Sequence, residues 1–255
     1  MNTIVNLLES KVKLYNTLDY IETDPIQIPH RFTIKEDIEI ASFLTATIAW
    51  GQRKTIIKNA SFMMDLMENS PCDFVLNASE ADLQNLRQFV HRTFNGVDLE
   101  LFVRQLRNIY VNHLGLESVF TAGYKLNNTV YSALLHFREV FFESVGVCRT
   151  SKHISDVSTN SAAKRLNMML RWLVRNDDCG VDFGIWNQIP MSALMIPLDV
   201  HVGNISRELG LLSRKQNDWK ALEELMNVLR VFDAEDPVKY DYALFGMGVF
   251  NDSFL

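Results

Sequence analysis

A lysine and an aspartate stand at places in this sequence where they could do covalent chemistry. Asp199 follows Pro197 in the stretch LMIPLDVHVGNISRELGLL and opens a predicted helix that ends at Gly210. A carboxylate at a helix start accepts backbone N–H bonds and faces the positive end of the helix dipole, so capping alone explains it. The same carboxylate could also stabilise positive charge that develops on a substrate. The sequence leaves both interpretations open.

Lys164 lies in the predicted helix 161–175, SAAKRLNMMLRWLVR, whose N-cap we expect at Asn160 or Ser161. The first turn of a helix disfavours a cation by roughly 0.3–1 kcal/mol. The adjacent Arg165 adds further positive charge. Both effects favour the neutral amine, which is the form that attacks an electrophilic carbon. The alternative interpretation is an ordinary solvated lysine on the surface.

The elements that must position these residues are predicted to be helices. Hydrophobic residues recur with a helical period over most of the chain, and strand-like alternation is short and isolated, so we expect an all-α fold. Three helix starts are predicted from capping residues: the capping box Thr33-x-x-Glu36, Asp98 and Asp218.

The domain organisation follows from the same pattern. We expect a single all-α domain over residues 1–255, built as two helical lobes with a cleft between them: 35–145, and 1–34 together with 146–255. The irregular stretches 145–160 and 176–197 flank the helix that carries Lys164, and the second leads directly to Asp199. Any chemistry should therefore gather there.

Composition limits the classes of function. The 255 residues are 47% hydrophobic and 22% charged, with a formal charge of −6, which argues against a general DNA-coating protein. The charge is uneven, because residues 149–175 hold six basic side chains and only one acidic one, Asp156. A second basic group follows Gly51: Arg53, Lys54 and Lys58. Such groups steer anionic ligands or are simply solvated helix faces.

Cysteine, histidine and hydropathy patterns argue against several alternatives. The three cysteines are scattered without a CxxC pair, and no cysteine follows Cys179, so we expect no metal, no iron–sulfur cluster and no other cofactor. The first residues, MNTIVNLLESKVKLYN, carry charges inside an amphipathic pattern and do not read as a signal peptide. No apolar run is long enough to span a membrane. The odd, scattered cysteines favour a reducing environment, so the expected location is the cytoplasm.

Three stretches resemble known families. KRLNMMLRWLVR, IPLDVHVG and DPVKYDYALFGMGV resemble a bacterial family of uncharacterised proteins over most of the chain. IPLDVHVGNISRELGLL also resembles the aspartate segment of DNA glycosylases of the helix–hairpin–helix superfamily. The resemblance implies a two-lobed helical fold in which Asp199 is the catalytic carboxylate. The hairpin signature, hydrophobic-x-Gly-x-Gly, is degenerate or absent in CGVDFGIWNQIP, where Gly180 and Gly184 are the only substitutes.

Further site residues follow from this resemblance. Lys164 matches the Schiff-base lysine of the archaeal 8-oxoguanine glycosylase arrangement, in which lysine and aspartate are a few dozen residues apart, here 35. In the commoner enzymes the lysine lies near the position of Gly180, and no lysine occurs between 165 and 199 here. The remaining nucleic-acid contacts that we expect are Gln52 and Arg53, which fall where such enzymes place a polar wedge, with Lys54, Arg165, His201 and Gly203.

The mechanism implied is base excision. The base is rotated out of the stack and held against aromatic side chains, for which Trp172, Phe183 and Trp186 are the candidates, although aromatic residues at helical spacing are usually core. His201 could touch phosphate or hydrogen-bond locally. Gly203 allows a close neighbour, either a phosphate backbone or another helix.

Three functions therefore stay open. The first is a DNA glycosylase and abasic-site lyase that acts on a damaged base, such as an oxidised purine, through a Lys164 imine assisted by Asp199. The second is a catalytically inactive nucleic-acid-binding protein of the same fold. The third is an all-α protein-interaction module, favoured by the net charge and by methionine-rich helices that include Met63, Met64 and Met67. The oligomeric state is not predicted.

Overall fold

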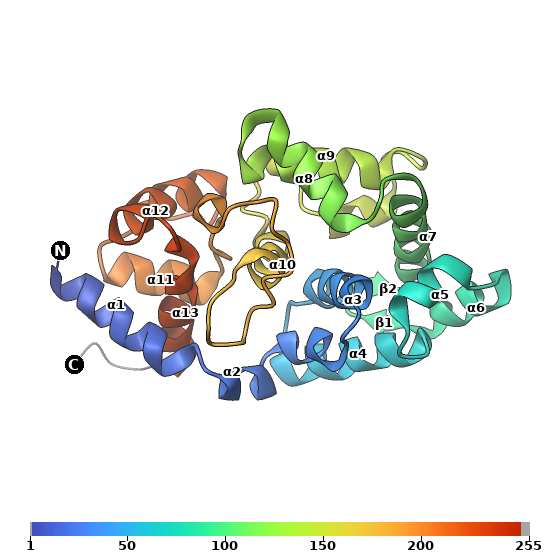
Figure 1. Cartoon of the computed structure of the whole chain (residues 1–255), viewed down its shortest axis with the longest axis horizontal. Coiled ribbons are helices and arrows are strands. Elements are labelled where there is room, and N and C mark those ends of the chain that lie inside the picture. Colours follow the sequence, from blue (N-terminus) through green and yellow to red (C-terminus); the bar gives the residue numbers. More distant parts are fainter. Residues whose placement is uncertain (1, 251–255) are drawn as a thin grey trace. The chain divides into compact units, whose positions relative to one another are not determined.

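The structure, a computed structural model, describes residues 2–250, and its regular elements are mostly α-helices (Figure 1). The predicted all-α class is therefore confirmed. Met1 and residues 251–255, which belong to the predicted domain 1–255, lie outside the described residues. Within residues 2–250 no helix is both long and apolar enough to cross a membrane.

The chain divides into two compact units. The first unit joins residues 1–20 to residues 156–255, and the second contains residues 21–155. The predicted lobe 35–145 lies within the second unit, which extends further at both ends. The extensions lack helical periodicity but are packed: Ile26 is fully buried, and the ring of His153 stacks against that of Trp50 with centroids 6.2 Å apart.

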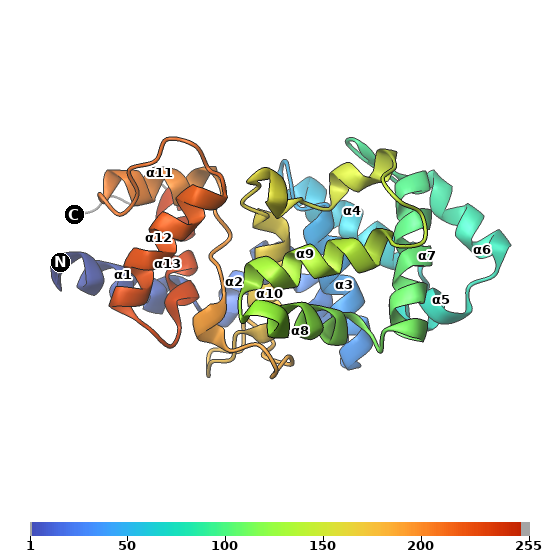
Figure 2. The ribbon, with the colours of Figure 1, turned by 90° about the horizontal axis from the view of Figure 1, so that it is seen from above.

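The second unit holds the longer series of helices. Helices α8 and α9 lie side by side in both views (Figures 1 and 2), and a Cβ on Gly123 would lie only 2.9 Å from the Cα of Ala133. Its elements after α2 (Leu18–Thr23), which contains the boundary, are α3 (Lys35–Thr47), α4 (Arg53–Leu66), α5 (Pro71–Asn77), α6 (Glu80–Asn85), β1 (Val90–His91), β2 (Phe94–Asn95), α7 (Gly96–Asn112), α8 (Leu116–Asn127) and α9 (Val130–Phe142).

Phenylalanine rings in mutual contact form part of the core of this unit. Phe43 lies within 5.6 Å, centroid to centroid, of Phe102, Phe137 and Phe141. The short antiparallel pair β1–β2 was not expected from the sequence, because two-residue strands leave no alternating pattern. The three methionines of α4 and the residue after it, Met63, Met64 and Met67, are fully buried. They belong to the core, so they give no support to an exposed methionine-rich interaction surface.

Two predicted helix starts need correction. Helix α3 begins at Lys35, and the residue in the N-cap position is Ile34, which makes no side-chain cap bond, so the predicted capping box Thr33-x-x-Glu36 does not form. Helix α7 begins at Gly96, with Asn95 as its N-cap. Asp98 instead serves the cap from the third helical position, where its carboxylate accepts a bond from the Asn95 N–H at 2.9 Å. The Asp218 cap is confirmed, because its carboxylate accepts a bond from the Ala221 N–H at 3.0 Å.

The first unit carries the residues singled out for chemistry. Helix α1 packs along α13 (Figure 1), where Gly246 leaves room for the ring of Tyr15: an added Cβ would lie 2.3 Å from its Cδ2 atom. The α-helices of this unit are α1 (Asn2–Tyr15), α10 (Lys164–Val174), α11 (Val200–Glu208), α12 (Trp219–Phe232) and α13 (Tyr240–Phe250).

The segment between α10 and α11 is irregular, as predicted. Between residues 175 and 199 the only helical turn is the short 3-10 turn Met191–Ala193. Gly180 and Gly184 both have positive φ, +73° and +58°. A helix–hairpin–helix requires a second helix after the hairpin, and no α-helix follows α10 before Val200. The motif is therefore absent from this stretch.

Candidate functional site at two helix N-termini

The structure brings Lys164 and Asp199 together. The Nζ atom of Lys164 lies 3.9 Å from the Oδ2 atom of Asp199, although the two residues are 35 positions apart in the sequence. The Lys164 side chain is 33% exposed and that of Asp199 is 14% exposed. Both side chains belong to the first residues of their helices, so the pair joins the N-terminus of α10 to that of α11.

The start of α10 differs in detail from the prediction. Lys164 is its first residue, and the N-cap position is held by Ala163 in the left-handed region, with φ of 46° and no side-chain cap bond. The two residues predicted as caps make other hydrogen bonds. The Ser161 hydroxyl accepts a bond from the Ala163 N–H at 3.3 Å, and the Asn160 amide donates to Asp218 Oδ2 at 2.9 Å. The first-turn position of Lys164 is confirmed, but its helix lacks a capping side chain.

Asp199 is the N-cap of α11. Its Oδ1 atom accepts a bond from the Val202 N–H at 2.9 Å, while its Oδ2 atom is the one that faces Lys164. One carboxylate oxygen therefore makes the cap bond, and the other is available to the amine. Capping fixes the direction of the side chain, and the oxygen not used by the cap is directed to the amine.

The loop between α11 and α12 positions the main chain of Asp199 through a hydrogen bond. The Asn217 amide donates from Nδ2 to the main-chain oxygen of Asp199 at 2.8 Å. The Arg207 guanidinium donates to Asn217 Oδ1 at 2.6 Å and to the main-chain oxygen of Arg214 at 2.8 Å. Because Arg207 occupies the oxygen side of the amide, its nitrogen side is directed to Asp199.

Asn217 also explains Gly203. A Cβ on Gly203 would lie 2.6 Å from Asn217 Oδ1 and 2.8 Å from Arg207 Nη1. The close neighbour that the sequence predicted is therefore a side chain of the protein itself, and not a phosphate or a second helix. This occupied contact removes the reason for assigning Gly203 to nucleic-acid binding.

The same loop is joined to the start of α10. Asn160 and Asp218 are linked through the side-chain bond above and through the main chain, since the Trp219 N–H donates to the Asn160 oxygen at 3.0 Å. The loop therefore contacts the segments preceding both helices that carry the candidate pair.

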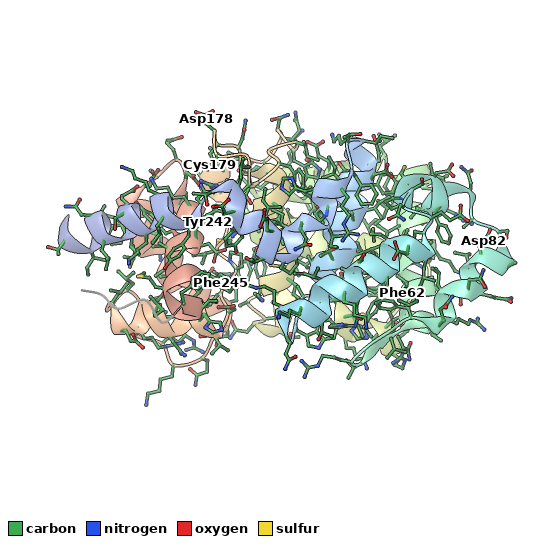
Figure 3. All side chains as sticks on the ribbon, turned by 90° about the horizontal axis from the view of Figure 1, so that it is seen from below. Phe62, Asp82, Asp178, Cys179, Tyr242 and Phe245 are labelled. Carbon is green, nitrogen blue, oxygen red and sulfur yellow. The ribbon has the colours of Figure 1, made fainter. Side chains whose placement is uncertain are left out.

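A buried ion-pair network lies on the same face of α10 as Lys164. Arg171 and Arg175 follow Lys164 by seven and eleven residues, which is the repeat of one helix face, and both are 2% exposed. Arg171 is bonded to Asp182, with Nε 3.2 Å from Oδ1, and to Asp241. Its guanidinium carbon lies 4.4 Å from the ring centroid of Tyr242, a residue of α13 that is labelled in Figure 3.

Asp241 is a buried titratable carboxyl whose pKa is influenced by both residues of the candidate pair. Burial raises the pKa of Asp241 to about 7, and the charges of Asp199 and Asp182 act in the same direction, while Arg171 and Lys164 oppose them. Removal from water is the largest of these influences and outweighs the contact with Arg171.

Two further predicted binding residues of this unit have local partners. His201 is exposed, but its Nδ1 atom lies 3.1 Å from the main-chain oxygen of Gly248 and its ring packs edge-on against Phe245, which Figure 3 labels. Two roles were predicted for His201, contact with a phosphate and a local hydrogen bond, and the structure shows the local hydrogen bond. Arg165 is partly buried, and burial lowers the pKa of its guanidinium to about 10.

The three candidate stacking residues differ in exposure. Trp172 is fully buried and Trp186 is 1% exposed, so neither ring presents a face to a flipped base in this structure. Phe183 is half-buried, and its N–H donates to the main-chain oxygen of Trp172 at 2.7 Å. Of the three, Phe183 is the one that is not buried.

The wedge residues predicted from the resemblance belong to the second unit. Gln52 is the N-cap residue of α4 and is exposed, although its side chain makes no cap bond. Arg53 and Lys54 are the first two residues of the same helix.

The sequence missed Asn217, Asp241 and Arg171. The sequence did contain a signal for Arg171. Arg171 and Arg175 continue the helix face that carries Lys164, and charged side chains there must either be solvated or pair with carboxylates. Nothing local marked Asn217, whose importance comes from its contact with a helix one loop earlier. Within residues 2–250 no three side chains of histidine, cysteine, aspartate or glutamate gather as metal ligands.

The fold and this pair define an all-α protein with an amine and a carboxylate set across two helix N-termini. The chain belongs to the family described as "Protein of unknown function (DUF2400)", whose model matches residues 24–250. No curated protein and no solved structure matches the chain.

Proposed function

We propose that the chain is a DNA glycosylase with abasic-site lyase activity, with Lys164 as nucleophile and Asp199 as the assisting carboxylate. The observation that carries the proposal is the 3.9 Å separation between Lys164 Nζ and Asp199 Oδ2 at two helix N-termini. A structural ion pair would explain that distance as well. The partial exposure of both side chains and the resemblance of the aspartate segment to glycosylases favour the catalytic role.

The chemistry needs both groups. The lone pair of the unprotonated Lys164 amine forms a bond to C1′ of the deoxyribose as the C1′–N bond breaks, and the base leaves with that electron pair and takes up a proton. The attached nitrogen loses one proton, its lone pair forms the C1′=N bond as the C1′–O4′ bond breaks, and O4′ takes up the proton, which gives a protonated imine. Removal of a C2′ proton then expels the 3′-phosphate.

Asp199 has two tasks in this scheme. Its carboxylate stabilises the positive charge that develops at C1′ while the base leaves. Its Oδ2 atom also lies 3.9 Å from the Lys164 amine, so the carboxylate can take the proton that the amine must lose. The N-cap bond to Val202 keeps the carboxylate in place for both tasks.

The test is trapping of the imine. The whole chain is incubated with duplex oligonucleotides that carry an abasic site, 8-oxoguanine or another damaged base, in the presence of borohydride, and covalent adducts are resolved on a denaturing gel. We expect an adduct with at least one lesion, lost in Lys164→Ala and kept in Lys220→Ala, an exposed lysine of the same unit. Absence of an adduct across the panel, or an unchanged adduct in Lys164→Ala, contradicts the proposal.

One observation favours a second function, a nucleic-acid-binding protein without catalysis. The stretch 175–199 forms no second helix, so the phosphate clamp of the helix–hairpin–helix glycosylases has no counterpart there. This alternative predicts DNA binding without adduct, base release or strand cleavage on any lesion. A time course with released base measured separately from cleaved strand distinguishes the two functions.

A further inference from the structure

Two segments of the second unit make a face that carries basic residues without acidic ones. Residues 50–64 and 86–97 contain no aspartate and no glutamate. Their basic residues are Arg53, Lys54, Lys58, Arg87 and Arg92. Arg87 is paired with Glu100, with Nε 2.8 Å from Oε2. We define the basic group as Arg53, Lys54, Lys58 and Arg92.

Hydrogen bonds hold the two segments side by side. The Nε2 atom of His91 lies 3.2 Å from the main-chain oxygen of Trp50, to which it donates, and its Nδ1 atom accepts from Asn59 Nδ2 at 2.9 Å. Burial lowers the pKa of His91, which keeps the ring in the neutral form that these two bonds require. The hairpin β1–β2 is therefore fixed against α4 by a buried histidine.

Aromatic packing extends the same junction along α4. The ring of Phe62, which Figure 3 labels on α4, stacks against that of Phe89 with centroids 6.3 Å apart. Phe89 and His91 of the hairpin-bearing segment thus both contact α4.

Arg92 is placed at the N-terminus of α4 by Gly51. Arg92 is exposed at the tip of the hairpin, in the left-handed region with φ of 55°. Gly51 has φ of +109°, and a Cβ there would lie 2.6 Å from Arg92 Nη1. The missing side chain at Gly51 lets the guanidinium approach the backbone just before Arg53 and Lys54.

This arrangement places positive charge at the N-terminus of α4, where the helix dipole disfavours cations. Arg53 and Lys54 stand in the first turn of α4, at the positive end of the helix dipole, and the first turn holds no acidic residue. Lys58 follows Lys54 by four residues and so lies on the same face one turn on. The first carboxylate along α4 is Asp65, close to its C-terminal end. Such a face attracts a polyanion.

We propose that Lys54, Lys58 and Arg92, together with Arg53, form a binding face for the phosphate backbone of nucleic acid. The choice of nucleic acid rests on the proposed function. The exposed hydroxyls of Thr55 and Thr93 on the same two segments are further phosphate donors, and a row of separate cations suits a chain of phosphates. Lys58 and Arg92 extend the contact beyond the residues that the sequence singled out.

The test is the salt dependence of DNA binding by the whole chain. Fluorescence anisotropy of a labelled 20-base-pair duplex is followed between 50 and 200 mM salt. Each lost phosphate contact makes the slope of log affinity against log salt less steep by about 0.9. We expect that change in Arg92→Ala and in Lys58→Ala, and a slope like that of the parent in Arg92→Lys. Lys125→Ala, an exposed lysine at the end of α8 in the same unit, is the matched control.

Three outcomes would contradict the proposed binding face. They are an unchanged slope in Arg92→Ala and Lys58→Ala, an equal change in Lys125→Ala, or binding to vesicles of anionic lipid in place of DNA. The trapping assay at saturating DNA separates this proposal from the proposed function. Salt-sensitive binding lost in Arg92→Ala without any adduct in the parent leaves the face standing and removes the glycosylase. An adduct with unchanged binding in Arg92→Ala does the reverse.

Discussion

The side-chain amide of Asn217 donates a hydrogen bond to the main-chain oxygen of Asp199, at 2.8 Å, from the far end of the α11–α12 loop. The bond reaches the residue that caps α11 and faces Lys164. Arg207 fixes the orientation of the amide from its other side, at 2.6 Å. Asn217 is therefore a positioning residue for Asp199, and Gly203 provides the space in which it stands.

Gly203→Ala tests that relationship. Alanine in a helix interior is ordinarily favoured over glycine by about 1 kcal/mol. Here the new Cβ would lie 2.6 Å from Asn217 Oδ1, and overpacking of this kind costs about 1–3 kcal/mol. We expect a net loss of stability, measured as the free energy of unfolding in urea by tryptophan fluorescence. Trp172, Trp186 and Trp219 make this signal report mainly on the first unit.

The double variant Gly203→Ala with Asn217→Ala is the control. Removing the Asn217 side chain removes the clash, so the loss in the double variant should be smaller than the sum of the two single losses by about 1 kcal/mol or more. Additive losses would show that Asn217 does not occupy the space above Gly203.

Asp199 variants separate capping from chemistry. Asparagine caps a helix about as well as aspartate, whereas alanine costs about 0.5–2 kcal/mol. The ion pair with Lys164 is partly exposed and contributes at most about 1 kcal/mol. We therefore expect Asp199→Asn to keep nearly the parent stability and to lower the rate of adduct formation by about 10²-fold or more.

Asp199→Ala should lose both stability and adduct. If Asp199→Asn instead forms adducts at the parent rate, the negative charge has no part in the reaction and Asp199 is a cap only. Rates are compared by quenching the borohydride reaction at fixed times, and stability by urea unfolding.

The buried arginines of α10 should be far more sensitive than an exposed one. Arg175 Nη1 lies 3.0 Å from Asp182 Oδ2 and its Nη2 lies 2.8 Å from Asp236 Oδ2, at 2% side-chain exposure. Arg175→Met would leave the buried Asp182 with Arg171 as its remaining cation and remove the partner of Asp236, and breaking a buried pair in this way costs about 3–5 kcal/mol. Arg214→Met breaks a pair with Asp218 in which the arginine is 34% exposed, and should cost far less because water screens the pair. Equal losses in the two variants by urea unfolding would contradict this ranking.

Local patterns in the sequence predicted those parts of the fold that depend on neighbours in the chain. The all-α class, the first-turn position of Lys164 and the caps at Asp199 and Asp218 all follow from residues within one or two helical turns. The capping box at Thr33 failed because the chain enters α3 through Ile34. Position and type of residue favour a cap there, but the path of the preceding segment decides whether it forms.

The contacts that shape the candidate site are not local. Asn217 meets Asp199 and Gly203 across a loop, and Arg171 meets Asp241 across 70 residues. Trp172 could be assigned to the core or to a ligand from its spacing alone, and only packing shows that it is fully buried. Pairing of Lys164 with Asp199 was predicted through a family resemblance and not through any pattern that contains both residues.

The carboxyl of Asp241 should make the stability of the chain depend on pH. In the folded chain burial raises its pKa from 3.8 to about 7, while in the unfolded chain the group keeps its ordinary value. Between these two pH values the folded state holds a proton that the unfolded state has released. Raising the pH through this window therefore lowers the free energy of unfolding, by at most about 1.4 kcal/mol per pH unit. Above the folded pKa, this contribution stays lost.

Asp241→Asn removes the titration and keeps the shape, so the difference between parent and variant isolates this group from Asp182, Asp199, Lys164 and Arg171, which surround it. Urea unfolding of both proteins at pH 5, 6, 7 and 8 should show the variant gaining stability over the parent as the pH rises toward 7, with little further gain at pH 8. Asp178→Asn, at an exposed carboxylate of the same unit labelled in Figure 3, is the matched control and should show a constant difference. A constant difference for Asp241→Asn as well would mean that the contact with Arg171 outweighs burial and keeps the carboxylate ionised throughout.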